Sequence, residues 1–225
     1  MADISFVSVG TPQSATGAIT VPWGVHQSGD IGIMLIDTLG SDGDASLATA
    51  NGFTQITGSP VTGTNKLSIW WARADSSSMS SPITNDSGDH QFGQIAVFRN
   101  CVATGTPIGA NYTTKNATSA TMLFDGITTT RSKSMILNCV GISVSSATPQ
   151  LSSWTNGEMV SMTEAIDYAA IPGENGGIGL AYGIKTTVGA ISQTQVTCST
   201  SRNYCTMQIE LLAPLSGGGL MLFSS

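Results

Sequence analysis

The residues best suited to chemistry by type and spacing are two acids and a histidine in the segment NDSGDH: Asp86, Asp89 and His90. A histidine beside carboxylates could move a proton in general acid–base catalysis. All three residues, however, lie in one polar turn between two apolar runs, where Asp side chains commonly accept backbone N–H bonds. We therefore interpret the cluster as a turn that leads into a strand opened by His90.

A second acidic segment, DTLGSDGD, could gather oxygen ligands for Ca²⁺ from Asp37, Asp42 and Asp44. It lacks the bidentate acid that closes an EF-hand loop. A polar loop with Asx turns is the favoured interpretation, so the sequence predicts no metal site here.

A carbohydrate-active enzyme would need two carboxyl groups on facing strands. The dense acidic set that could supply them is Glu158, Glu164, Asp167 and Glu174. Nothing in the sequence selects a pair among them, and no nucleophile elbow or phosphate-binding loop is present. The sequence therefore predicts a protein that is not an enzyme and that uses no cofactor.

The cysteines leave three alternatives open. Cys198 and Cys205 bracket the segment CSTSRNYC, near an expected hairpin turn, where a cross-strand disulfide is possible. Cys101 and Cys139 each stand in an Asn-Cys-Val triplet. Free buried thiols are the other main alternative. Metal binding is the third, although no C-x-x-C spacing supports it.

The tryptophans could form a platform for stacking on a sugar ring. Trp70 and Trp71 are adjacent in a strand-like run, so their side chains point to opposite faces of a sheet. At most one of them faces the main core, and the other covers a second layer, an interface or a ligand. Core or interface roles are favoured for Trp23, Trp70, Trp71 and Trp154, with glycan binding as the alternative.

Short apolar runs separated by turn signals predict an all-β chain. The runs Leu67–Arg73 and His90–Arg99 are apolar on both pleat faces, which is typical of strands buried on two sides. Asp44–Ala50 could form at most a short helix. The fold class expected for residues 1–214 is a single antiparallel β-sandwich, jelly-roll-like, with extended terminal arms. The other predicted strands are Ile4–Val9, Ile31–Asp37, Phe53–Thr57, Thr121–Phe124, Ser134–Val144, Ala165–Ile171, Gly177–Lys185, Ile191–Cys198 and Tyr204–Leu212.

The C-terminal segment, residues 215–225, reads as an arm: Gly217–Gly219 form a hinge before a short apolar tip. Burial of such side chains contributes about 1.5–3 kcal/mol each before ordering costs. The tip could fold back on its own domain, dock on a neighbouring subunit or stay disordered. We predict that it binds a partner together with the N-terminal strand, through Ile4, Phe6, Leu220, Met221, Leu222 and Phe223.

The composition points away from nucleic acid and membranes. The net charge is −6, and the eight basic residues are scattered along the chain, so they form no phosphate-tracking stripe. The apolar runs are too short to span a bilayer, and no targeting segment is visible. Only 10% of residues are charged, against about 25% in an average soluble domain. Such a surface suits a protein of an assembly as well as a secreted β domain.

The order GAITVPWGVHQSGDIGIMLIDT, NGFTQITGSP, LSIWWARADSSS and ITNDSGDHQFGQIAVFRNC resembles a group of tailed-bacteriophage virion proteins of jelly-roll or sandwich type. The resemblance covers roughly residues 5 to 150 and is best at Trp70–Arg73 and Asp86–Phe98.

The resemblance implies a capsid decoration (cement) protein or a minor tail protein. A decoration protein would be made in the host bacterial cytoplasm, join the virion, and bind the major capsid protein, copies of itself, or both. The alternative is a tail or receptor-binding protein that recognises host glycan.

Overall fold

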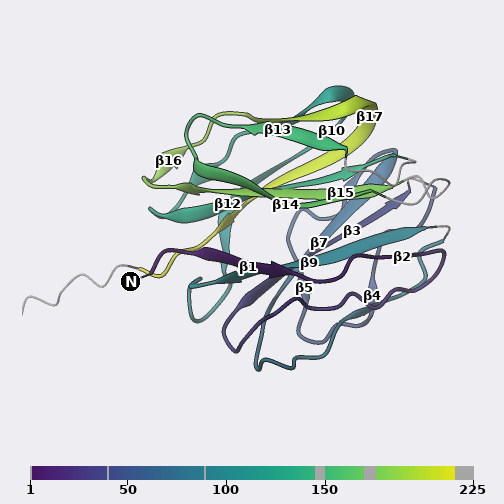
Figure 1. Ribbon diagram of the computed structural model, residues 1–225, viewed down its shortest axis with the longest axis horizontal. Helices are drawn as coiled ribbons and strands as arrows, with labels where there is room; N and C mark the ends of the chain where they lie inside the picture. The colour runs from purple at the N-terminus through teal and green to yellow at the C-terminus, as the bar shows by residue number, and fades with distance from the viewer. Residues whose placement is uncertain (1, 40, 89, 145–149, 170–175, 216–225) are drawn as a thin grey trace, which may run out of the picture.

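The computed structural model describes residues 2–39, 41–88, 90–144, 150–169 and 176–215, and these residues form two large antiparallel β-sheets packed face to face and two small two-stranded sheets (Figure 1). The predicted all-β sandwich is confirmed. The first half of the chain builds one sheet and the second half builds the other. The strands of the first half are β1 (Ser5–Val9), β2 (Gln13–Ala15), β3 (Ile31–Leu39), β4 (Leu47–Thr49), β5 (Thr54–Gln55), β6 (Val61–Thr62), β7 (Asn65–Arg73), β8 (Ile83–Thr84) and β9 (Gln91–Arg99). Those of the second half are β10 (Ile108–Phe124), β11 (Thr128–Thr129), β12 (Ser134–Ile142), β13 (Leu151–Thr155), β14 (Val160–Ala169), β15 (Gly177–Lys185), β16 (Gly189–Ala190) and β17 (Thr194–Leu211).

The first sheet is seven-stranded, with the order β1-β9-β3-β7-β5; β2 also pairs with β9 and β6 with β7. Its central strand, β3, pairs with β7 on one side and β9 on the other, so that Ile33 lies opposite both Trp71 and Ala96. Both faces of these strands are buried. Ile33 and Ile69 face the second sheet, while Trp70 lies on the outer face beneath a second apolar cluster. The predicted two-sided burial is confirmed.

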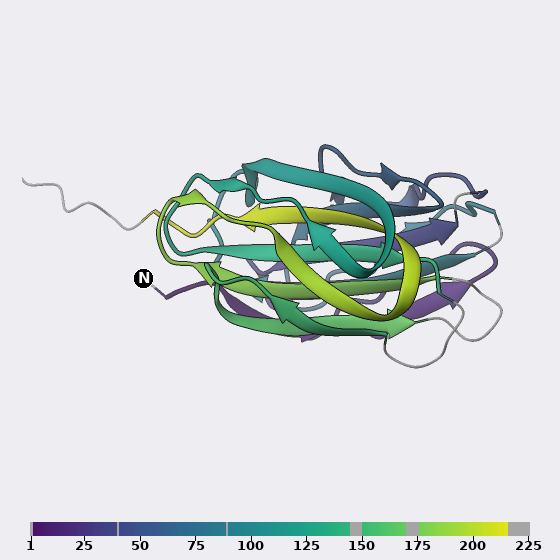
Figure 2. The same cartoon turned by 90° about the horizontal axis from the view of Figure 1, so that it is seen from above.

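The second sheet is six-stranded, with the order β10-β17-β12-β15-β14, and β13 also pairs with β17. Its strands β10 and β17 are unusually long and pair with each other over most of their length. Figure 2 shows β17 curving over the sheet it belongs to. The far part of this strand pair therefore covers the outer face, where Phe124 and Val196 pack with Val140 and Ile142.

Three local expectations need correction. The possible helix at Asp44–Ala50 is wrong, because Leu47–Thr49 forms β4 and pairs with β8. The hairpin expected between Cys198 and Cys205 is also wrong, because both cysteines lie on the single strand β17. Residues on one extended strand cannot approach closely enough for a disulfide, and Cys101, Cys139, Cys198 and Cys205 are all free and buried.

The third correction concerns β10, which begins at Ile108 and not near Thr121. Its first part, NYTTKNATSAT, has few apolar residues and no apolar alternation to mark it as a strand. The backbone of this part is held as a strand by its hydrogen bonds to β17, and not by the burial of alternating apolar side chains.

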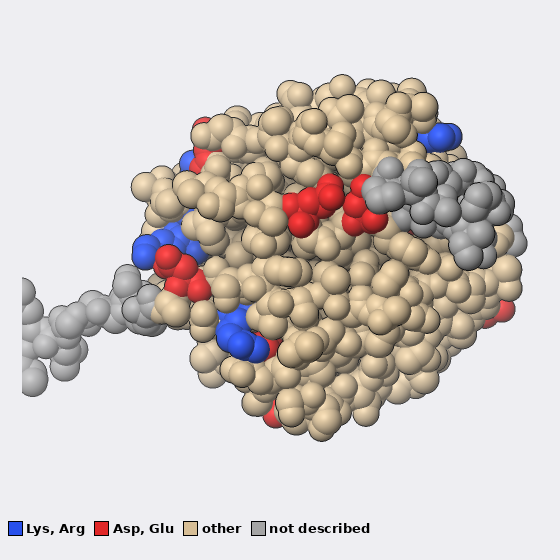
Figure 3. Space-filling model, viewed as in Figure 1, with Lys and Arg blue, Asp and Glu red and all other residues tan. Residues whose placement is uncertain are grey.

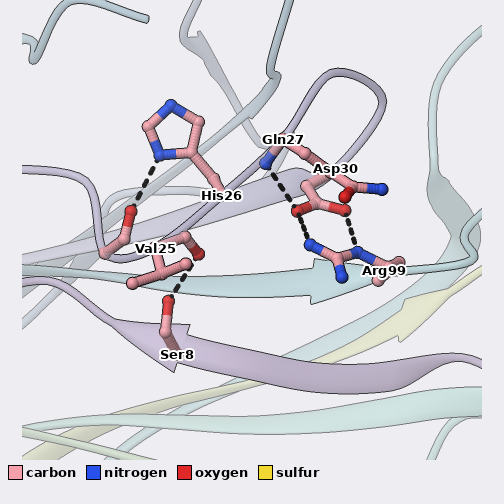
Figure 4. Close-up of polar contacts among 7 residues, drawn as sticks. Ser8, Val25, His26, Gln27, Asp30 and Arg99 are labelled. Carbon is pink, nitrogen blue, oxygen red and sulfur yellow. Dashed lines mark hydrogen bonds and ion pairs between the residues drawn. The ribbon is translucent and has the colours of Figure 1, made fainter. Parts of the chain in front are cut away.

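A loop at the end of the first sheet is fixed by an ion pair between a buried aspartate and a partly exposed arginine (Figure 4). Both oxygens of Asp30 accept hydrogen bonds from the guanidinium of Arg99, from Nε at 2.8 Å and from Nη2 at 2.7 Å. Asp30 also accepts the backbone N–H of Gln27, and His26 Nδ1 is 2.8 Å from the carbonyl oxygen of Gly24. Because Asp30 is almost fully buried, the bidentate pair ties this loop to β9.

Candidate functional site

The open edge of the sandwich holds a groove between β5, at the edge of the first sheet, and β10, at the edge of the second. We call it the edge groove, and its volume is about 490 Å³. It is lined by Thr54, Gln55, Ile56, Thr57, Trp71, Thr106, Ile108, Gly109 and Tyr112. It draws its side chains from three separate parts of the chain.

Trp71 reaches the edge groove because of the register of β7. The ring lies on the face of β7 that meets the second sheet, and it packs against the central core. Among the described residues, the strand beyond β7 at this position is β5, which is two residues long and pairs Thr54 with Trp71. The indole is therefore half-buried: one side contacts the core and the other faces the groove.

Tyr112 forms the opposite side of the edge groove. The pairing of β10 with β17 is irregular between Ile108 and Tyr112, and such bulges redirect side chains. The Tyr112 ring lies against Gly58, whose φ is +88°. A Cβ at Gly58 would stand 2.3 Å from Cε2 of Tyr112, so only a glycine accommodates both the backbone conformation and the ring.

The rim of the edge groove is polar but uncharged. Thr54, Gln55 and Thr57 are exposed, and their side chains make no hydrogen bond to any residue that the structure describes. Thr106 Oγ1 accepts the backbone N–H of Ile108 at 3.2 Å. None of the described residues that line the groove carries a charge. The groove thus offers two aromatic rings surrounded by neutral hydrogen-bonding groups.

A second concavity lies at the end of the sandwich where the N-terminus and the last described residues meet (Figure 1). We call it the terminal cavity, and its volume is about 370 Å³. Figure 3 shows acidic and basic side chains together at this end, on a face that is otherwise largely uncharged. The cavity is lined by Ala2, Asp3, Thr130, Arg131, Ser132, Lys133, Val188, Ala213, Pro214 and Leu215.

The terminal cavity combines charges with exposed apolar side chains. Lys133 Nζ is 2.9 Å from Asp3 Oδ1, and Arg131 donates a hydrogen bond to the carbonyl oxygen of Ala213. Val188 and Leu215 are 58% and 70% exposed. Both of these exposed apolar side chains line the same cavity as the charged residues.

A buried carboxylate beneath the terminal cavity holds its wall in place. Glu210 is fully buried on β17. It accepts four hydrogen bonds, from the backbone N–H groups of Thr130 and Arg131 and from the hydroxyls of Thr130 and Ser134. Because a buried carboxylate needs such donors, Glu210 fixes the turn that carries Arg131 and Lys133.

The structure does not assemble a catalytic group at NDSGDH. Asp86 Oδ1 accepts the backbone N–H of Gly88 at 3.0 Å, and the backbone N–H of His90 donates to Asp42 at 3.3 Å. His90 directly precedes β9, and Asp89 lies outside the described residues. Asp86 and His90 therefore behave as the turn interpretation predicts.

The three acids of the segment DTLGSDGD also lie apart from one another and have different partners. Asp42 accepts the backbone N–H of Leu39, and Asp44 forms an ion pair with Lys66. Asp37 instead points between the sheets, where burial raises its pKa well above the usual range; hydrogen bonds from Asn65 and the backbone of Gly177 oppose this more weakly. The three acids do not converge on one site.

The acids near the second sheet's edge have separate partners as well. Glu158 accepts the backbone N–H of Ser192, and Trp154 Nε1 donates to Glu164 at 2.6 Å. Asp167 accepts the backbone N–H of Leu151 at 2.9 Å. Burial is the main cause that raises the pKa of both Glu164 and Asp167. Glu174 lies outside the described residues.

The four tryptophans have different surroundings. Trp23 contacts His26 and Phe53, and Trp154 packs near Phe124. Trp70 is 4% exposed in the outer cluster of the first sheet. Trp71 alone among the four lines one of the two concavities described above.

The predicted partner-binding residues divide between the core and the undescribed segment. Ile4 is 4% exposed in the central core, and the ring of Phe6 packs against Phe98 and Tyr182. In the isolated chain both side chains contact their own domain. Leu220, Met221, Leu222 and Phe223 lie outside the described residues. The partner-binding role of all six stays a prediction.

The chain was compared with family models, curated proteins and solved structures, and none of them matches it. Within the described residues there is no group of three or more His, Cys, Asp or Glu side chains that could hold a metal ion. The same residues include no helix long and apolar enough to cross a membrane.

Sequence reasoning found Trp71 as a candidate but missed its neighbours in the edge groove. Tyr112 lies in the polar part of β10, where no apolar alternation marks a strand. Thr54, Gln55 and Thr57 read as ordinary turn and strand residues. The pair Trp70-Trp71 indicated that the two rings lie on opposite faces of a sheet, but not which of them would line a groove.

Proposed function

We propose that this protein is a structural component of a tailed-bacteriophage virion that decorates the capsid and reinforces it by binding the major capsid protein. The sequence resemblance supports this proposal. The observation that carries it is the terminal cavity, where residues from both ends of the described chain, Ala2 and Asp3 and Ala213–Leu215, line one surface.

Two chain ends that leave a domain on the same side can reach the same neighbouring subunit. Linking two weak contacts in this way raises the effective concentration of the second contact once the first has formed. The exposed side chains of Val188 and Leu215 add apolar area at the base of the two ends. The mechanism is binding through a spread interface, with the C-terminal segment as the principal contact.

The test is the occupancy of capsids by a variant that lacks residues 216–225. We expect the truncated protein to bind purified capsid shells at least tenfold more weakly, because burial of even one large apolar side chain contributes about 1.5–3 kcal/mol. Unchanged occupancy would contradict the proposal.

A comparison of two valine substitutions tests whether the terminal cavity is part of the interface. Val188→Ser changes an exposed valine of the terminal cavity, and Val160→Ser changes a valine of similar exposure, 54%, on β14 outside that cavity. We expect only Val188→Ser to weaken binding to capsid shells. Equal effects of the two changes would place the interface elsewhere.

The copy number of the protein per virion separates the capsid from the tail. A number that follows the number of capsid subunits supports decoration. A number that matches the few copies of a tail component supports the alternative location.

A further inference from the structure

We propose that the edge groove binds a neutral saccharide against the side chains of Trp71 and Tyr112, which both line it. This is an additional binding site, and it depends on neither the capsid location proposed above nor the terminal cavity. It rests on the convergence of aromatic rings from β7 and β10 with a rim of neutral polar side chains.

The aromatic rings supply the apolar part of the recognition. A pyranose ring presents C–H groups on its faces, and these stack favourably on an aromatic side chain. Trp71 is held by the core on one side and is open to the groove on the other. Tyr112 is partly buried against the central core, and its ring lies beside Gly58. Both rings are therefore fixed before a ligand arrives, which reduces the entropy cost of binding.

The rim supplies the polar part. Sugar hydroxyls donate and accept hydrogen bonds, and threonine hydroxyls and glutamine amides can do the same. The side chains of Thr54, Gln55 and Thr57 and the indole N–H of Trp71 have no hydrogen-bond partner within the described residues. These groups are available to a ligand without breaking any contact inside the domain.

The absence of charge among the described lining residues selects the class of saccharide. A sialic or uronic acid brings a carboxylate that needs a cation or several N–H donors. Among the described residues no Lys or Arg lines the edge groove, whereas Arg131 and Lys133 line the terminal cavity. Arg73, on the same strand as Trp71, donates a hydrogen bond through Nη2 to the carbonyl oxygen of Gly105. The volume of about 490 Å³ falls in the range of small-ligand sites. The structure therefore favours neutral hexose or N-acetylhexosamine units.

The test begins with the purified full-length protein on an array that carries neutral oligosaccharides and their sialylated or uronic-acid counterparts. The strongest neutral glycan is then titrated by calorimetry against the native protein and three variants. Gln55→Ala removes a rim amide, Tyr112→Phe removes one hydroxyl, and Trp71→Phe keeps a ring in the core while it shortens the stacking surface. Gln195→Ala, an exposed strand glutamine away from the groove, is the matched control.

We expect binding to neutral glycans, with each groove variant about fivefold to tenfold weaker, as the loss of one hydrogen bond or part of a stacking surface implies. Gln195→Ala should bind as the native protein does. Thermal unfolding of every variant checks that the fold is retained, and Gln55→Ala carries the test if Trp71→Phe destabilises the core. Three results would overturn the proposal: no neutral glycan bound, binding restricted to acidic glycans, or groove variants indistinguishable from Gln195→Ala.

Discussion

The edge groove and the terminal cavity are similar in size but opposite in chemistry. The groove is lined by aromatic and neutral polar side chains, and the cavity by Asp3, Arg131 and Lys133 beside exposed apolar residues. The groove arises where a two-residue edge strand leaves the inner face of β7 uncovered. The cavity arises where loops and chain ends meet above a buried carboxylate.

The comparison shows that one sandwich can carry two chemically different surfaces, each held in place by its own part of the fold. Side chains of the groove are positioned by sheet register, which resists local change. Those of the cavity are positioned by the hydrogen bonds that Glu210 accepts. A substitution that disturbs the Glu210 hydrogen bonds should therefore alter the terminal cavity and leave the edge groove unchanged, and a substitution in the groove should do the reverse.

The largest effect is expected from Glu210→Ala. The change leaves the backbone N–H groups of Thr130 and Arg131 and the hydroxyl of Ser134 without the acceptor that Glu210 supplies, and we expect a loss of about 3 kcal/mol in the free energy of unfolding. Urea denaturation measures this loss. Glu158→Ala, at an exposed acid with one backbone partner, is the control and should cost less than about 1 kcal/mol. Equal losses would show that Glu210 is not the main support of the terminal cavity.

A smaller effect is expected from Gly58→Ala. The alanine has to adopt a positive φ, and its Cβ collides with the ring of Tyr112, so we expect a loss of about 2 kcal/mol in stability. Gly105→Ala has a similar backbone conformation, φ +70°, but its Cβ meets nothing within 4 Å; it should cost about 1 kcal/mol. The difference between the two measures the contact that positions Tyr112. No difference would mean that the ring moves freely.

The pH dependence of stability tests the buried carboxyl group of Asp37, between the two sheets. Burial raises the pKa of Asp37 in the native state above its unfolded value, so the unfolded chain releases this proton at lower pH. The contribution of Asp37 to the free energy of unfolding is therefore largest below about pH 4 and decreases as the pH rises. The loss has a slope of at most about 1.4 kcal/mol per pH unit.

The measurement is the free energy of unfolding against pH for the native protein and two variants. Asp37→Asn should give a shallower decline above about pH 4. Asp44→Asn, at an exposed acid that pairs with Lys66, should leave the decline unchanged. A native-like slope in Asp37→Asn would show that this carboxyl does not titrate as its burial implies.

The smallest effect is expected from Lys133→Ala. Lys133 and Asp3 are both more than half exposed, and exposed ion pairs contribute about 0–1 kcal/mol, less at high salt. Thermal unfolding should change little, and binding in the edge groove not at all. A large loss of stability would mean that the terminal cavity depends on its surface charges as well as on Glu210.

Much of the fold was predictable because its signals are local. The runs at Leu67–Arg73 and His90–Arg99 are apolar on both faces, and the structure buries both faces. The polar start of β10 carries no such signal, because partner strands and not side-chain burial stabilise it. The short apolar-rich run Asp44–Ala50 is compatible with a helix or a strand. It contains a strand, β4, because this segment pairs with β8.

The candidate sites were less predictable than the sheets. Trp70 and Trp71 could be assigned to opposite faces of a sheet but not told apart as groove residues, and Tyr112 lies far away in sequence and reaches the groove through the pairing of β10 with β17. The contact between Gly58 and Tyr112 has no local signature. Likewise, nothing near Glu210 in the sequence indicates that Thr130 and Ser134 will be its donors.

The sequence by itself determined the β class, the two-sided burial of the central strands and the low charge of the surface, because each depends on neighbouring residues along one strand or on composition. Only the tertiary structure decided that Trp71 and Tyr112 line one neutral groove and that the two ends of the described chain, Ala2 and Asp3 and Ala213–Leu215, line one charged cavity. These features depend on which strand ends at a sheet edge and which long-range pairs form. Such contacts join residues that are distant in the chain, so no local pattern records them.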